Sequence, residues 1–68
     1  MRYETAVLKV LDHLRQNADR PEFRTYTMIK RECDIREYQW RVIRKILVNV
    51  GAVVEERDGN RKILKIVQ

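Results

Sequence analysis

The sequence contains one thiol and one imidazole, but neither side chain has the partners that nucleophilic, acid–base or metal chemistry would need. Cys33 is the only cysteine and His13 the only histidine among 68 residues. They cannot form an internal disulfide or supply the ligand set of a structural zinc site. No second titrating group accompanies His13 in a catalytic motif, and no nucleophile elbow or phosphate loop occurs. We therefore expect no enzymatic activity, no cofactor and no small-molecule substrate, with Cys33 buried and His13 at or near the surface.

The basic residues have a more informative pattern, because they are concentrated in two short segments. The chain has 15 Lys and Arg against 10 Asp and Glu, a formal net charge of +5. Residues 36–45 contain four basic residues and one acidic residue, and residues 57–65 repeat that composition. The only charged residues between these segments, in residues 46–56, are Glu55 and Glu56. Since electrostatic potential follows local clustering, a fold that brings both basic segments to one face would attract a polyanion.

The length limits the architecture that can position these segments. Residues 1–68 make at most one domain, which buries barely enough apolar surface to fold without a metal or disulfides. No apolar run reaches the length of a membrane span, and the residues after Met1 lack the apolar core of a signal peptide. We expect a cytoplasmic protein with no membrane partner.

The first half of the chain is expected to contain two helices. Apolar residues recur at helical spacing over residues 3–17, and Pro21 then interrupts the pattern. Aromatic residues and threonines favour a brief strand near Thr25. Thr27 is expected to cap a short helix that continues to Glu32.

A third helix is expected over residues 35–49. Asp34 can cap its start, and Gly51 can end it by supplying a positive φ. The predicted inward face of this helix consists of Trp40, Ile43, Ile46, Leu47 and Val50.

The C-terminal part is expected to form a β-hairpin. Residues 52–57 and 61–67 favour extended structure, and the sequence Asp58-Gly59-Asn60 between them is typical of a tight turn. The predicted fold class is therefore α+β and mainly α, with three helices and a C-terminal hairpin.

The stretch Ile35–Arg57, with Trp40, Ile43, Leu47, Gly51 and Val54 in step, resembles the recognition-helix-to-wing junction of winged-helix transcription regulators. As a pattern, the resemblance covers nearly the whole chain. It implies a winged helix-turn-helix fold and a nucleoid-associated regulator that binds double-stranded DNA. The third helix would lie in the major groove, and the hairpin wing would lie on the backbone or in the minor groove.

Independently of this resemblance, inward packing of the apolar face would leave the basic side chains of the third helix exposed. Arginine can pair bidentately with guanine and glutamine with adenine, so Arg36, Gln39 and Arg41 are expected to read bases. The complete set of expected DNA-binding residues is Arg36, Tyr38, Gln39, Arg41, Arg44 and Lys45 in the third helix and Arg57, Arg61 and Lys62 in the wing. Lesser candidates for phosphate contacts are Arg24, Lys30 and Arg31.

Other interpretations of the same features remain open. The cations could form a solvated face, or discourage edge-to-edge aggregation of the hairpin. Trp40 could stack on bases instead of filling the core. The main alternative function is a protein-interaction module of a larger assembly, and single-stranded nucleic acid would need Tyr26 and Tyr38 as stacking platforms. Because one module covers only about 600–1,000 Å² of DNA, we expect a homodimer, with the first helix as its contact surface.

Overall fold

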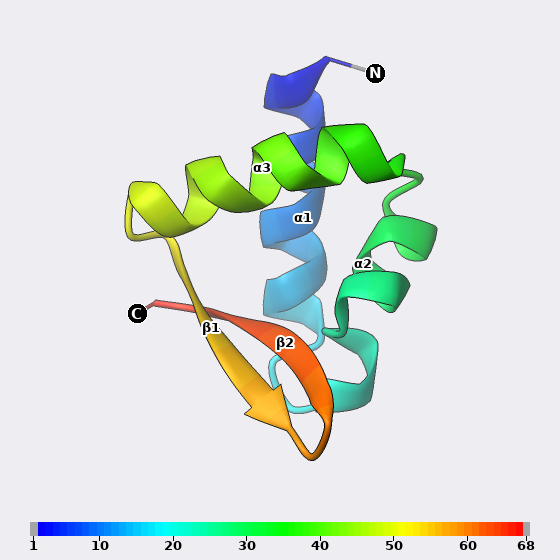
Figure 1. Cartoon of the computed structure of the whole chain (residues 1–68), viewed down its shortest axis with the longest axis vertical. Coiled ribbons are helices and arrows are strands. Elements are labelled where there is room, and N and C mark those ends of the chain that lie inside the picture. The colour runs from blue at the N-terminus through cyan, green and yellow to red at the C-terminus, as the bar shows by residue number, and fades with distance from the viewer. Residues whose placement is uncertain (1, 68) are drawn as a thin grey trace.

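The computed structural model describes residues 2–67, which form three helices followed by an antiparallel hairpin (Figure 1). The elements are α1 (Tyr3–Gln16), the 3-10 turn η1 (Pro21–Phe23), α2 (Tyr26–Glu32), α3 (Glu37–Asn49), β1 (Val53–Asp58) and β2 (Arg61–Ile66). This is a mainly helical α+β arrangement with a winged-helix-like layout, which confirms the predicted fold class. Within residues 2–67, no helix is both long and apolar enough to cross a membrane.

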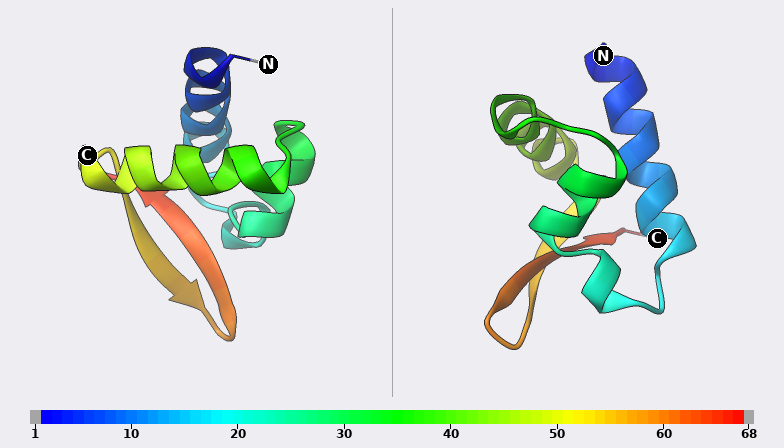
Figure 2. Two further views of the ribbon diagram at one scale, coloured as in Figure 1. Left: turned by 45° about the horizontal axis from the view of Figure 1, so that its top comes forward. Right: turned by 90° about the vertical axis from the view of Figure 1, so that its right-hand side faces the viewer.

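The three helices and the hairpin are arranged so that α3 and the wing project from the same side. In Figure 1, α3 lies in front of α1 and crosses it, with α2 beside both. The hairpin leaves the C-terminal end of α3, and its tip extends away from the helices. The side view in Figure 2 shows α3 and the hairpin tip on one side of the molecule and α1 on the other. The two basic segments therefore belong to elements that share a side.

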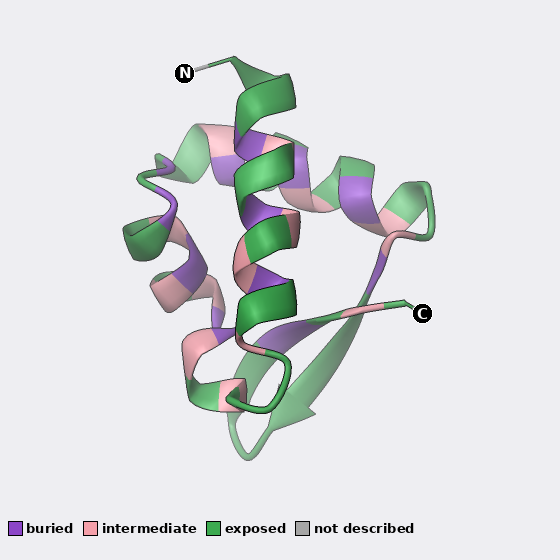
Figure 3. Cartoon of the chain, turned by 180° about the vertical axis from the view of Figure 1, so that it is seen from behind, coloured by how far each residue is buried: buried purple, intermediate pink, exposed green. Residues whose placement is uncertain are grey.

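A core of apolar side chains joins all of these elements. Figure 3 shows buried residues on each helix and on β2, whereas the hairpin tip is exposed. Trp40 is only 2% exposed and lies within this core, which confirms the expectation for this residue. The fully buried side chains of the core include Val10 and Leu14 of α1, Ile29 of α2, Ile43 and Leu47 of α3, Val53 of β1 and Leu64 of β2.

The sequence predicted too many inward-facing residues in α3. Trp40, Ile43 and Leu47 are buried, but Ile46 is 41% exposed and Val50 is 69% exposed. At 100° per residue, Ile46 lies about a quarter turn away from the buried row. Val50 follows the last residue of α3, beyond the part of the helix that packs on the core.

The start of α2 differs from the prediction by two residues. The side chain of Thr25, not that of Thr27, caps the helix by accepting a hydrogen bond from the Met28 backbone N–H at 3.3 Å. Thr25 also forms an isolated bridge with Ile63, so the predicted short strand is a single bridged residue. Thr25 therefore both caps α2 and joins it to the wing.

Asp34 does not cap α3, because α3 begins at Glu37. Asp34 instead follows the end of α2 with a φ of 54°, in the left-handed region. The backbone N–H of Ile35 donates to the Lys30 carbonyl at 2.8 Å, and that of Asp34 donates to the Arg31 carbonyl at 3.3 Å. This is the Schellman pattern, in which backbone groups after a helix satisfy its last carbonyls.

Gly51 ends α3 in the same way, as predicted. Its φ is 75°, and its N–H donates to the Val48 carbonyl at 3.1 Å. The N–H of Ala52 donates to the Leu47 carbonyl at 3.0 Å. One turn geometry thus sets both the approach to α3 and the exit from it into the wing.

The hairpin turn is tighter than the three predicted residues. Asp58 and Arg61 are a cross-strand pair, so only Gly59 and Asn60 form the loop. Gly59 has a φ of 64°. A glycine with positive φ at the first loop position suits the right-handed twist of a two-residue hairpin.

Candidate nucleic-acid interface

The candidate site is the surface formed by α3, the wing and the first turn of α2. The five predicted residues of α3 and its N-cap residue Arg36 are all at least partly accessible: Arg36, Tyr38, Arg41 and Lys45 are exposed, and Gln39 and Arg44 are half-buried. The core beneath them is made by the buried row of the same helix. The arginines of α3 are therefore directed away from the core, as the sequence predicted.

The strand register determines which wing residues face the helices. Glu55 pairs with Leu64, and Arg57 pairs with Lys62. Side chains of directly paired residues lie on one face of a hairpin, and alternate residues share a face. Arg57 and Lys62 thus lie on the same face as Glu55 and the buried Leu64, whereas Arg61 belongs to the opposite face. All three wing cations are exposed.

Tyr26 connects α3 to the wing at this surface. The guanidinium carbon of Arg44 lies 5.2 Å from the centroid of the Tyr26 ring, a cation–π distance. The Tyr26 hydroxyl donates a 2.6 Å hydrogen bond to Oε2 of Glu55. Its ring also packs edge-on against the buried Trp40, with 5.3 Å between centroids. Burial, and then the hydrogen bond to Glu55, raise the pKa of Tyr26, against the opposing influence of Arg44.

An open hollow separates the wing from the start of α2. It has a volume of about 420 Å³. Its lining consists of Thr25, Tyr26, Thr27, Met28, Arg61 and Lys62. Two cations and two threonines therefore border a recess beside the Tyr26 ring, and such groups can bind a backbone phosphate.

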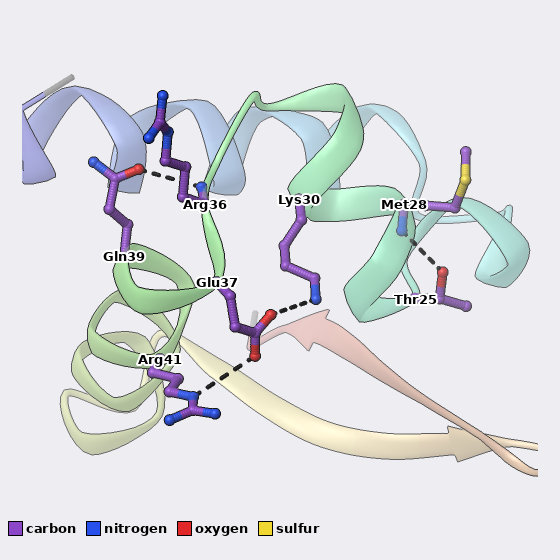
Figure 4. A network of polar contacts seen from close by, with 7 residues as sticks. All are labelled: Thr25, Met28, Lys30, Arg36, Glu37, Gln39 and Arg41. Atoms are coloured by element: carbon purple, nitrogen blue, oxygen red, sulfur yellow. Dashed lines mark hydrogen bonds and ion pairs between the residues drawn. The ribbon is translucent and has the colours of Figure 1, made fainter.

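Glu37 reduces the positive charge available at the start of α3. Oε2 of Glu37 lies 2.6 Å from Nζ of Lys30, and Oε1 lies 3.7 Å from Nε of Arg41 (Figure 4). The hydrogen bond from Lys30 is the main reason that the pKa of Glu37 is lowered from its usual 4.5. Lys30 and Arg41 are therefore both ion-paired in the free protein, although the Arg41 side chain is still 72% exposed.

Arg36 and Gln39 form a local contact at the same end of the helix. The backbone N–H of Arg36 donates to Oε1 of Gln39 at 3.2 Å (Figure 4). Together with Asp34 and Tyr38, they line a second open hollow of about 440 Å³. This contact at the start of the helix uses the carboxamide oxygen of Gln39 but not its NH₂ group.

Arg24 does not belong to the interface, which corrects its prediction as a phosphate contact. It is 8% exposed. Its Nε donates to the Asn17 carbonyl at 3.0 Å, and one terminal nitrogen donates to the Leu64 carbonyl at 2.9 Å. The Leu64 backbone N–H in turn donates to the Arg24 carbonyl at 3.2 Å. Arg24 thus anchors β2 to the loop after α1.

The two side chains with possible chemical reactivity lie outside this surface. Cys33 is 4% exposed, and burial is the main reason that its thiol pKa is raised. Nε2 of His13 lies 2.7 Å from the Phe23 carbonyl, so the half-buried ring links α1 to η1. In residues 2–67, no group of three His, Cys, Asp or Glu side chains could hold a metal ion.

Tyr26 and Glu55 were not predicted as members of the site. The sequence indicated Tyr26 only as a platform for single-stranded nucleic acid, and Glu55 only as an interruption of positive charge. The two residues are 29 positions apart, and no motif in the sequence indicates that they meet.

Comparison with known proteins does not place the chain in a family. No protein-family model matches it, and neither a curated protein nor a solved structure shows significant similarity to it.

Proposed function

We propose that this chain binds double-stranded DNA and regulates transcription by recognising selected sequences. In this proposal, α3 lies in the major groove and the wing contacts the backbone or the neighbouring minor groove. The cations of residues 36–45 and 57–65 would neutralise phosphates, and arginines of α3 would contact base edges. No catalytic step is involved.

The observation that carries the proposal is the position of Tyr26 between α3 and the wing. Arg44 of α3 lies over the Tyr26 ring, and Tyr26 is hydrogen-bonded to Glu55 of β1. Arg61 and Lys62 of the wing line the same hollow as Tyr26. The Glu55 carboxylate, which separates the basic segments in sequence, accepts the hydrogen bond of the tyrosine hydroxyl. These contacts support one surface that combines cations of α3 and of the wing.

Titration with duplex DNA at increasing salt tests this proposal. Four or five phosphate contacts predict that log affinity falls with log salt with a slope of about −4. Duplexes selected from a random pool should bind more tightly than scrambled duplexes of equal length. Absence of salt-dependent binding below millimolar DNA would contradict the proposal.

A homodimer on a two-fold DNA site is part of the proposal, because one small module covers little DNA. Sedimentation of the saturated complex with a palindromic selected duplex should give two chains per duplex. One chain per duplex would contradict the dimer without affecting DNA binding itself.

A protein partner is the alternative function, and one observation favours it. Val42 and Ile46 of α3 and its C-cap residue Val50 recur at intervals of four and are 42%, 41% and 69% exposed. Such a row on a helix is suited to contact with another protein. Under this alternative, Ile46→Glu would abolish partner binding, and removal of wing cations would leave it unchanged.

A further inference from the structure

We infer that Tyr26 is a positioning residue that presents Arg44 to DNA and makes it the specificity-determining arginine of α3. This inference rests on the proposed function. It changes the sequence-based expectation, in which Arg36, Gln39 and Arg41 were the base-reading residues and Tyr26 had no role in duplex binding.

The cation–π contact restricts the Arg44 side chain. Its guanidinium carbon lies over the Tyr26 ring, 5.2 Å from the ring centroid. A guanidinium group carries five N–H donors around its edge, so contact with one ring does not engage them all. The donors on the side away from the ring can pair with a guanine edge or a phosphate.

The Tyr26 ring is itself held by contacts with three elements. Tyr26 belongs to the first turn of α2, its ring packs against Trp40 of α3, and its hydroxyl donates to Glu55 of β1. Trp40 is 2% exposed, so one support of the ring belongs to the core. A side chain held in place before binding loses less conformational entropy when the complex forms. Arg44 is consequently more ordered in the free protein than an arginine that extends into solvent.

The other candidate base readers have local partners. Nε of Arg41 lies 3.7 Å from the Glu37 carboxylate, which offsets part of the positive charge of Arg41. The carbonyl oxygen of Gln39 accepts from the Arg36 backbone. No ion pair within 4.0 Å involves Arg44 in the part of the chain that the structure describes. Among these residues, Arg44 combines a restricted side chain with a charge that neither of these ion pairs neutralises.

A double-mutant cycle between Tyr26 and Arg44 tests the inference. Affinities for a selected and a scrambled duplex are measured for the wild type, Tyr26→Leu, Arg44→Gln and the double variant. Tyr26→Leu should weaken the selected duplex by about two- to fivefold, the magnitude of an exposed cation–π contact, with a smaller effect on the scrambled duplex. In the Arg44→Gln background, Tyr26→Leu should have almost no further effect. Arg20→Gln, at an exposed position in the loop after α1, is the matched control and should not change the ratio of the two affinities.

Two further measurements separate positioning from a loss of folding. Thermal unfolding shows that each variant is folded at the temperature of the assay. In the NMR spectrum of the free protein, the Arg44 side-chain protons should be shifted upfield by the Tyr26 ring. Tyr26→Phe should keep this shift, because it keeps the ring and removes only the hydrogen bond to Glu55, whereas a folded Tyr26→Leu should lose it.

The outcomes distinguish this inference from the proposed function. If the wild type binds no duplex, the proposed function fails, and the inference fails with it. If the wild type binds but Tyr26→Leu weakens binding equally with and without Arg44, Tyr26 does not act through Arg44 and only the inference is overturned. An Arg44 side chain without a ring-current shift in the wild type would also overturn it.

Discussion

Arg24 and Arg44 carry the same guanidinium group, but their surroundings give them different roles. Arg24 is buried and donates to the carbonyls of Asn17 and Leu64, so its donors are used within the protein. Arg44 is half-buried, and its guanidinium lies over the Tyr26 ring in a cation–π contact. Whether an arginine contributes to stability or to binding therefore depends on how its donors are used.

We expect Arg24→Met to destabilise the fold strongly. Two charge-assisted hydrogen bonds are lost and two carbonyls lose a partner, so the free energy of unfolding should fall by about 2–4 kcal/mol. Urea denaturation measures this change. Arg20→Met, at an exposed position shortly before it in the same loop region, should stay within about 0.5 kcal/mol of the wild type. Equal effects of the two substitutions would show that Arg24 is not an anchor.

At the scale of the elements, the two turns around α3 set its position relative to α2 and the wing. Both turns use a residue in the left-handed region, Asp34 at 54° and Gly51 at 75°. Each satisfies the last carbonyls of the preceding helix with two backbone N–H groups. Only one of the two positions has the residue that this conformation favours, because an L-residue with a Cβ atom is strained there.

The two turn positions should therefore respond in opposite directions to substitution. Gly51→Ala should lower the free energy of unfolding by about 1 kcal/mol, and Asp34→Gly should raise it by about 0.5 kcal/mol. A Cβ atom at Gly51 would meet no other atom within 4 Å, so the loss would come from backbone strain alone. Chemical denaturation of both variants measures the effects. Destabilisation by Asp34→Gly would mean that the aspartate side chain contributes more than its backbone strain costs.

At the scale of the whole molecule, exposed cations lie on two sides, of which only one belongs to the proposed interface. α3 and the wing tip project from one side, and α1 covers the other (Figure 2). Exposed cations occur on both sides, including Lys9 and Arg15 of α1 and Arg57 and Lys62 of the wing. If all these cations were only solvated, removing either pair would have the same effect on DNA binding. In the proposed interface, only the wing pair contacts DNA.

Removing the wing pair should reduce the salt dependence of DNA binding. The double variant Arg57→Ala with Lys62→Ala should weaken all duplexes alike and reduce the magnitude of the slope of log affinity against log salt by about 1.8 per bound chain. Lys9→Ala with Arg15→Ala makes the same change in net charge and should leave the slope nearly unchanged. Equal slopes for the two double variants would show that net charge, and not the wing, determines binding.

Local patterns in the sequence predicted the helices and the hairpin because each depends on residues within one element. Helical spacing identified α1, the switch to β-favouring residues after Gly51 identified the hairpin, and Gly51 itself ended α3 as expected. The helix starts were less predictable. Thr25 and Thr27 can both accept a hydrogen bond from a nearby N–H, and Asp34 suits either a helix start or a left-handed turn. Short-range competition of this kind is decided by the packing of the rest of the chain.

The sequence by itself determined the elements of this protein and the concentration of cations in two segments, since both follow from residue type and near-neighbour spacing. Only the tertiary structure decided which cations are available. Arg24 donates to the carbonyl of a strand residue 40 positions away, and Arg44 lies over a tyrosine that donates to a glutamate of the wing. Such contacts join residues that are distant along the chain, and they form only when the core brings α2, α3 and the hairpin together. The candidate interface is therefore a property of the packed molecule.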